Sequence, residues 1–146
     1  MNPFDIKSVL LAKHAQHVVL IHFPIALFII GVAFDFVAHW KKQISLAAAA
    51  YYNLRVAAIS TLPVVATGII AWRWQLEGAK LRGNLLLHLA LALTSTFLIL
   101  LVWWIHQRAR RPNGSLPAFR LAVEVVGVLL LGVTAHLGGF LSGVNG

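Results

Sequence analysis

The sequence predicts an all-α fold, an integral membrane four-helix bundle that runs up and down within a single domain, residues 1–146. Of the 146 residues, 60% are hydrophobic and 11% are charged, whereas a soluble domain is roughly 45–50% apolar and about 25% charged. The hydrophobic residues also gather in four runs, and a membrane-spanning helix needs about 20 such residues. The composition therefore predicts contact with a lipid bilayer and excludes a soluble enzyme, a disordered chain and a nucleic-acid-binding domain.

The four apolar runs define the expected spans in order. The first covers about residues 18–40, after a polar segment that lacks the cleavage site of a removable signal peptide. The second covers about residues 46–72, the third about 84–105 and the fourth about 118–140. Because the linkers between the runs are short, successive helices should be antiparallel neighbours.

The basic residues report the topology of the chain rather than a nucleic-acid partner. The net charge is +8, and the Lys and Arg residues lie mainly between the apolar runs, as they do in the loops of membrane proteins. Arg55 and Arg120 give a small excess to the side of the first and third linkers. By the positive-inside rule we expect a multi-pass protein of the bacterial inner (cytoplasmic) membrane with both termini in the periplasm. The absence of cysteine excludes disulfides, Fe–S clusters and c-type haem attachment within the chain.

Three histidines lie at one expected depth in the membrane. His22, His88 and His136 are each about four residues from the same surface, and ionisable groups inside a membrane are functional by default. We predict that they bind a cofactor, haem b, with His22 and His88 as axial ligands of the haem iron and His136 as the alternate ligand. A chlorophyll held by a single histidine is the alternative cofactor. The other alternative is that no cofactor is bound and the histidines serve packing.

The remaining histidines are interpreted as interfacial or solvated. His39 and His106 each end a span beside basic residues, and His14 and His17 lie just outside the first span. The pairs at the two ends of spans one and three also indicate an internal repeat of two related hairpins, with His22 matching His88 and His39 matching His106.

Charged residues inside the spans predict a structural ion pair. Asp35, Glu124 and Arg55 should share the leaflet opposite His22, and pairing Arg55 with Asp35 or Glu124 would remove most of the cost of a lone charge there. A proton or ion path is the competing interpretation, but few polar residues link the two leaflets.

Short motifs along the chain resemble a known family. His-Phe-Pro-Ile-Ala-Leu-Phe at residues 22–28, followed by Phe34-Asp35, resembles the helix-one signature of uncharacterised bacterial membrane proteins with four helices and unknown function. Further matches are Thr67-Gly68 with Trp72, Leu87-His88, and the ending Ala135-His136-Leu137-Gly138-Gly139. The chain is most similar to family variants joined or adjacent to cytochrome c modules, and this resemblance implies an association with haem.

Together these features predict a small membrane subunit that takes part in electron transfer and is not an enzyme by itself. Its partners would be other membrane subunits of a respiratory or photosynthetic complex, possibly with a cytochrome c, and no nucleic acid. The alternatives are a cofactor-free scaffold subunit and a pigment-binding subunit, and a transporter is the least favoured reading.

Overall fold

A computed structural model describes residues 15–74 and 76–142, and these residues form helices joined by short linkers. The helices are α2 (Ala15–Leu20), α3 (His22–Lys41), α4 (Ile44–Trp74), α5 (Gly83–Ala109) and α6 (Arg120–Leu141). Since α2 leads into α3, the chain makes four long apolar helices, Gln16–Lys41, Ile44–Trp74, Gly83–Ala109 and Arg120–Leu141. All four are long and apolar enough to cross a membrane.

The break between α2 and α3 has a local cause in the sequence. Pro24 lies in the first turn of α3, and a proline has no backbone N–H to donate to the carbonyl one turn earlier. The backbone N–H of Ile21 still donates to the carbonyl of His17, and that of Ile25 donates to the carbonyl of Ile21. The helix direction is therefore adjusted at Ile21 without ending the span.

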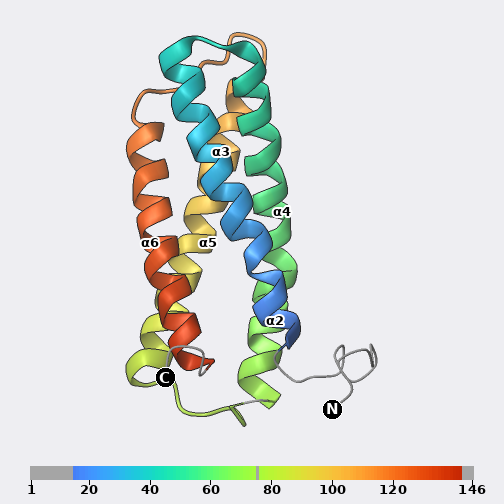
Figure 1. Ribbon diagram of the computed structural model, residues 1–146, viewed down its shortest axis with the longest axis vertical. Coiled ribbons are helices and arrows are strands. Elements are labelled where there is room, and N and C mark those ends of the chain that lie inside the picture. The colour runs from blue at the N-terminus through green and yellow to red at the C-terminus, as the bar shows by residue number, and fades with distance from the viewer. Residues whose placement is uncertain (1–14, 75, 143–146) are drawn as a thin grey trace.

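The four helices pack as two antiparallel hairpins. The first hairpin consists of α2, α3 and α4, and the second consists of α5 and α6 (Figure 1). The contacts within each hairpin are the most extensive, while α4 with α5 and α3 with α6 close the bundle. As a result α3 and α5 are diagonal to each other. The predicted all-α, up-down four-helix bundle is confirmed.

Small residues allow the helices to approach closely. A Cβ atom added at Gly31 of α3 would lie 2.9 Å from Cγ of Leu54 on α4, and one at Gly127 of α6 would lie 3.0 Å from Cζ of Phe28 on α3. Such small-residue contacts are typical of helix packing in membranes. The core around them is apolar and consists mainly of Phe28, Val32, Leu54, Ala57, Ala58, Ile99, Val102 and Leu131.

The buried positions of the two hairpins repeat at a constant separation. Four buried residues of α3 lie 71 positions before four buried residues of α5, namely Pro24, Phe28, Gly31 and Asp35 before Ser95, Ile99, Val102 and His106. Four buried residues of α4 lie 70 positions before four of α6, namely Ala50, Leu54, Ala57 and Thr61 before Arg120, Glu124, Gly127 and Leu131. The predicted repeat of two hairpins is thus present as a burial pattern, but its register differs from the predicted match of His22 with His88.

The outer surface of the bundle is apolar. Large hydrophobic side chains such as Phe23, Leu62, Phe97, Leu129 and Val133 are more than half exposed. A soluble protein rarely exposes apolar surface on this scale, whereas lipid-facing helices must. The chain is therefore a multi-pass integral membrane protein.

Candidate functional site

Four ionisable side chains meet inside one end of the bundle, and we call them the buried tetrad: Asp35, His106, Arg120 and Glu124. They come from three helices, α3, α5 and α6. The residues are at most 3% exposed, and Glu124 is fully buried. Arg120 and Glu124 are one helical turn apart and so share a face of α6. The tetrad lies near the end of the bundle that carries the first and third linkers, shown at the top of Figure 1.

Two short contacts organise the tetrad. Nε of Arg120 donates a hydrogen bond to Oδ2 of Asp35 over 2.7 Å, and Nη1 of Arg120 donates to the carbonyl of Pro117 over 3.2 Å. Nε2 of His106 and Oε1 of Glu124 share a hydrogen bond of 3.0 Å, and the same nitrogen lies 3.9 Å from Oδ2 of Asp35. The diagonal helices α3 and α5 are thus joined to each other and to α6 through charged groups.

One oxygen of the tetrad is left unpaired. Oε2 of Glu124 is buried and has no hydrogen-bond partner among the described residues. One ligand atom from each of Asp35, His106 and Glu124 lies within 4.8 Å of the other two, which is close enough to share a cation. Arg120 occupies an oxygen of Asp35 in the same space, so the site can hold a proton more readily than a multivalent ion, because Arg120 already supplies one positive charge.

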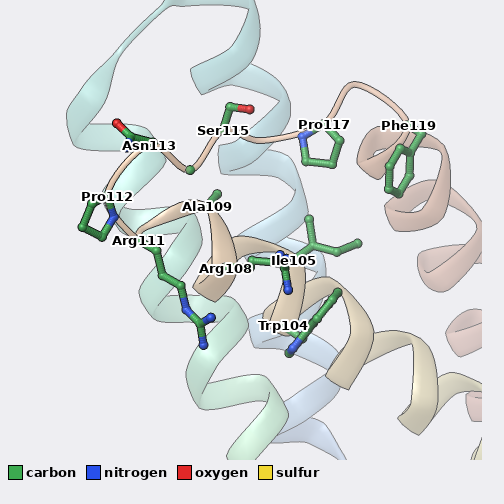
Figure 2. Close-up of a pocket in the computed structure, with 11 residues that line it drawn as sticks. Trp104, Ile105, Arg108, Ala109, Arg111, Pro112, Asn113, Ser115, Pro117 and Phe119 are labelled. Atoms are coloured by element: carbon green, nitrogen blue, oxygen red, sulfur yellow. The ribbon is translucent and has the colours of Figure 1, made fainter.

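A surface hollow lies beside the tetrad. It measures about 510 Å³ and is lined by residues of the C-terminal end of α5 and of the third linker. Ile105 and Phe119, which line it, directly precede His106 and Arg120 in the sequence, and Arg108 and Arg111 also line it (Figure 2). Water from this end of the bundle can therefore come within a side chain's length of the tetrad.

The structure corrects the expected partner of the buried acids. We expected Arg55 to pair with Asp35 or Glu124, but Arg55 is exposed on α4 and makes no ion pair with any described residue. Arg120 takes the role instead. The reason is rotational, because Leu54 and Ala58 point into the core of α4 and turn Arg55 outward.

His106 also differs from its expected interfacial place. It is 3% exposed and hydrogen-bonded to Glu124, since the bundle continues for a full turn beyond the expected end of span three. His39 is exposed at the end of α3, and His14 lies outside the described residues.

The three histidines predicted to bind a cofactor lie on different faces. His22 is exposed, and its Nδ1 is 2.7 Å from the carbonyl of Val18 in the preceding turn. His136 is exposed as well. His88 instead packs on α6, where a Cβ at Gly138 would lie 3.1 Å from its Cε1 atom. Since His136 is two residues before Gly138, it points away from the face that His88 contacts.

A histidine that we expected to be solvated lies beside His88 instead. His17 is half-buried, and a Cβ at Gly68 of α4 would lie 3.0 Å from its Cε1 atom. Its Nδ1 is 3.2 Å from Oγ1 of Thr67. The two imidazoles are near enough to interact electrostatically.

One signal in the sequence could have identified these groupings. The separation of 71 residues that relates α3 to α5 also relates His17 to His88 and Asp35 to His106. Our expected repeat matched His22 to His88 and His39 to His106, which is a shorter separation that does not place equivalent residues on equivalent faces. With the correct register, both groupings appear as pairs of related positions.

Comparisons with known proteins give a family but no function. The family described as "Predicted membrane protein (DUF2231)" matches residues 13–146. No curated protein and no solved structure matches the chain significantly.

Proposed function

This chain belongs to the family of predicted membrane proteins DUF2231, and we propose that within the membrane it binds and releases one proton at the buried tetrad. The observation that carries the proposal is the composition of the tetrad, two carboxylic acids, one guanidinium and one imidazole with almost no exposure to solvent. Intramembrane ionisable groups of this kind occur in proton relays and ion pathways.

A count of charges shows why a proton belongs in the site. Asp35 and Arg120 neutralise each other across their hydrogen bond. An ionised Glu124 beside a neutral His106 would leave one uncompensated negative charge, which is costly in a medium of low dielectric constant. One proton on the hydrogen bond between Glu124 and His106 makes the tetrad neutral, whichever partner holds it. A divalent cation in place of that proton would leave one excess positive charge.

The surroundings favour exchange of this proton with one side of the membrane. The hollow beside Ile105 and Phe119 opens toward the nearer surface. Toward the other surface, Phe28, Ile99 and Val102 form an apolar layer of the core. The proposal is therefore a proton-responsive site that changes how α3, α5 and α6 are held together, rather than a conducting path.

The test is to follow the protonation of both partners in lipid nanodiscs. Infrared difference spectroscopy between acidic and alkaline buffers detects a protonated carboxylic acid, and ¹⁵N NMR of labelled histidine detects the protonation of His106. We expect one titration step at which His106, Glu124 or both change protonation, and we expect Glu124→Gln to abolish it. Glu77→Gln is the matched control, because Glu77 is exposed in the second linker.

Two results would contradict the proposal. One is that His106 and Glu124 keep the same protonation over the whole pH range in which the protein stays folded. The other is that the titration step persists unchanged in Glu124→Gln, which would place the proton on another group.

Haem binding with electron transfer inside a larger membrane complex is our second proposal. It is supported by the exposure of His22 and His136 on the membrane-facing surface, where an imidazole without a polar partner is unfavourable. A haem ligated there would lie between this chain and another membrane subunit. The visible spectrum of the protein purified in mild detergent tests it.

The spectrum also separates the alternatives. A Soret band with sharp α and β bands on reduction indicates haem, and a band in the far red indicates chlorophyll. If neither is present when the protein is isolated with its membrane partners, the haem proposal is wrong and the cofactor-free scaffold is favoured. Replacing an axial histidine should convert a low-spin spectrum to high-spin or remove the haem.

A further inference from the structure

The end of the bundle opposite the tetrad carries two histidines in matching environments. His17 packs its ring against α4 at Gly68, and His88 packs its ring against α6 at Gly138. Each ring also approaches the backbone carbonyl four residues before that glycine, Val64 for His17 and Thr134 for His88. The absence of a side chain at each glycine lets the imidazole reach the backbone of the neighbouring helix.

The matching environments follow from the repeat of the two hairpins. His17 and His88 are 71 residues apart, as are the equivalent buried residues of α3 and α5, and Gly68 and Gly138 are 70 apart, as are those of α4 and α6. Because the first helices of the two hairpins are diagonal in the bundle, equivalent residues on their inner faces approach each other across it. The electrostatic interaction of the two rings agrees with this placement.

The nitrogens of the two rings are not all used by the protein. Nδ1 of His88 is buried and has no hydrogen-bond partner among the described residues. Nδ1 of His17 is 3.2 Å from Oγ1 of Thr67, and for its Nε2 the described part of the chain provides no side-chain hydrogen bond. Neither ring forms an ion pair with a described carboxylate. The pair thus offers neutral nitrogen donors whose rings are already oriented by contacts with the neighbouring helices.

We propose that His17 and His88 are the two protein ligands of a metal centre at this end of the bundle. Neutral imidazole nitrogens suit zinc, copper, nickel and iron, whereas calcium and magnesium need oxygen ligands. Two imidazoles complete the axial positions of a haem iron, or they hold a free transition-metal ion with other positions left for water. The shared chemistry is a metal bound by two imidazoles, and the site is independent of the buried tetrad.

The contacts of each histidine with the neighbouring helix supply the orientation that a metal site needs. A ligating histidine usually has its ring fixed by a hydrogen bond to a carbonyl, a carboxylate or water. The carbonyls of Val64 and Thr134 and the hydroxyl of Thr67 surround the rings in this way. His22 is different because its Nδ1 bonds the carbonyl of Val18 in its own helix and its ring is exposed.

The experiment is a set of titrations on the full chain in lipid nanodiscs. One arm adds hemin and records the absorption spectrum, and the other adds Co²⁺ or Cu²⁺ after metal has been removed with a chelator. Binding in the first arm alone indicates a haem, and binding in the second alone indicates a free ion. We expect His17→Ala and His88→Ala each to weaken binding by more than about tenfold, because loss of even an outer-shell partner of a metal ligand costs 10–100-fold.

The control variants are His22→Ala and His136→Ala, which replace exposed histidines near the same end and should leave binding unchanged. Electron paramagnetic resonance of the wild-type protein loaded with Cu²⁺ or haem counts the coordinated imidazoles and does not depend on whether a variant folds. Two coordinated imidazoles lost singly in the two variants is the expected result. The proposal is overturned if the wild-type protein binds neither probe, if the signal shows fewer than two imidazoles, or if the control variants abolish binding as strongly as His17→Ala and His88→Ala.

Discussion

The two hairpins bury equivalent positions but use them for different chemistry. In the first hairpin, the α4 positions Ala50 and Leu54 are apolar and fill the core. Their equivalents 70 residues later, Arg120 and Glu124 of α6, are charged and build the tetrad. The same frame of packed helices therefore supports an apolar core in one hairpin and a polar cluster in the other.

The comparison continues along α3 and α5, where the two ends of the bundle differ. At one end the equivalent residues are identical, His17 and His88, and they produce a pair of like groups. At the other end Asp35 and His106 are complementary and lie 3.9 Å apart. A repeated frame brings equivalent positions together, so a substitution on one copy alone converts a symmetric pair into an acid–base contact.

The largest test of this comparison removes the cation of the second hairpin. Arg120→Ala leaves Asp35 buried without its partner, and breaking a buried ion pair in this way costs about 3–5 kcal/mol. We expect a loss of that size in the free energy of unfolding, measured by denaturant titration in detergent micelles. Arg55→Ala is the control and should change stability by less than about 0.5 kcal/mol because its side chain is exposed. Equal effects of the two substitutions would show that Arg120 does not hold Asp35 in the folded protein.

A second test makes the second hairpin resemble the first by removing both charges. In the double variant Asp35→Leu with Arg120→Met, no charge is left unpaired, and apolar replacements of a buried ion pair are often neutral or stabilising. We therefore expect the double variant to recover at least about 2 kcal/mol relative to Arg120→Ala. The same denaturant titration measures this, and additive losses from the two substitutions would contradict the pairing.

The sequence predicted the fold well because apolar runs and short linkers determine which segments cross the membrane and in what order. It also placed Asp35 and Glu124 at the correct end of the bundle. It did not predict which basic residue pairs with them, because rotation about a helix axis decides between Arg55 and Arg120. When nearly every residue around a helix is apolar, hydropathy does not indicate which face is buried.

The histidines show the same limit. Depth alone grouped His22, His88 and His136, but a shared depth does not give a shared face. Only the burial pattern of the two hairpins fixes the register that relates His17 to His88, and that pattern is hidden in the sequence because the equivalent residues around it are not identical. A haem ligated by His22 and His88 therefore stays a prediction.

A smaller expected effect comes from placing the same amide at one position in each hairpin. Glu124→Gln keeps a hydrogen-bond partner in His106, so we expect a loss of no more than about 1 kcal/mol and a stability that no longer depends on the tetrad proton. Leu54→Gln puts the amide at the equivalent position of the first hairpin, where the neighbours are apolar, and should cost about 1–3 kcal/mol more. Thermal melting across a pH series measures both effects. If Leu54→Gln proves the milder of the two, the assignment of one hairpin as apolar and the other as polar is wrong.

The smallest effect concerns the glycines beside His17 and His88. A Cβ at Gly68 or Gly138 would lie 3.0 or 3.1 Å from the Cε1 atom of the imidazole, whereas a Cβ at Gly132 would meet no atom within 4 Å. Alanine is favoured over glycine inside a helix by roughly 0.8–1.0 kcal/mol, so Gly132→Ala should stabilise the protein by about that amount. Gly68→Ala and Gly138→Ala gain the same propensity but push the ring away, so we expect each to be about 1 kcal/mol less stable than Gly132→Ala. Because the two histidine environments match, Gly68→Ala and Gly138→Ala should have equal effects within about 0.5 kcal/mol, and a clear inequality in their unfolding free energies would break the equivalence of the two hairpins at this end.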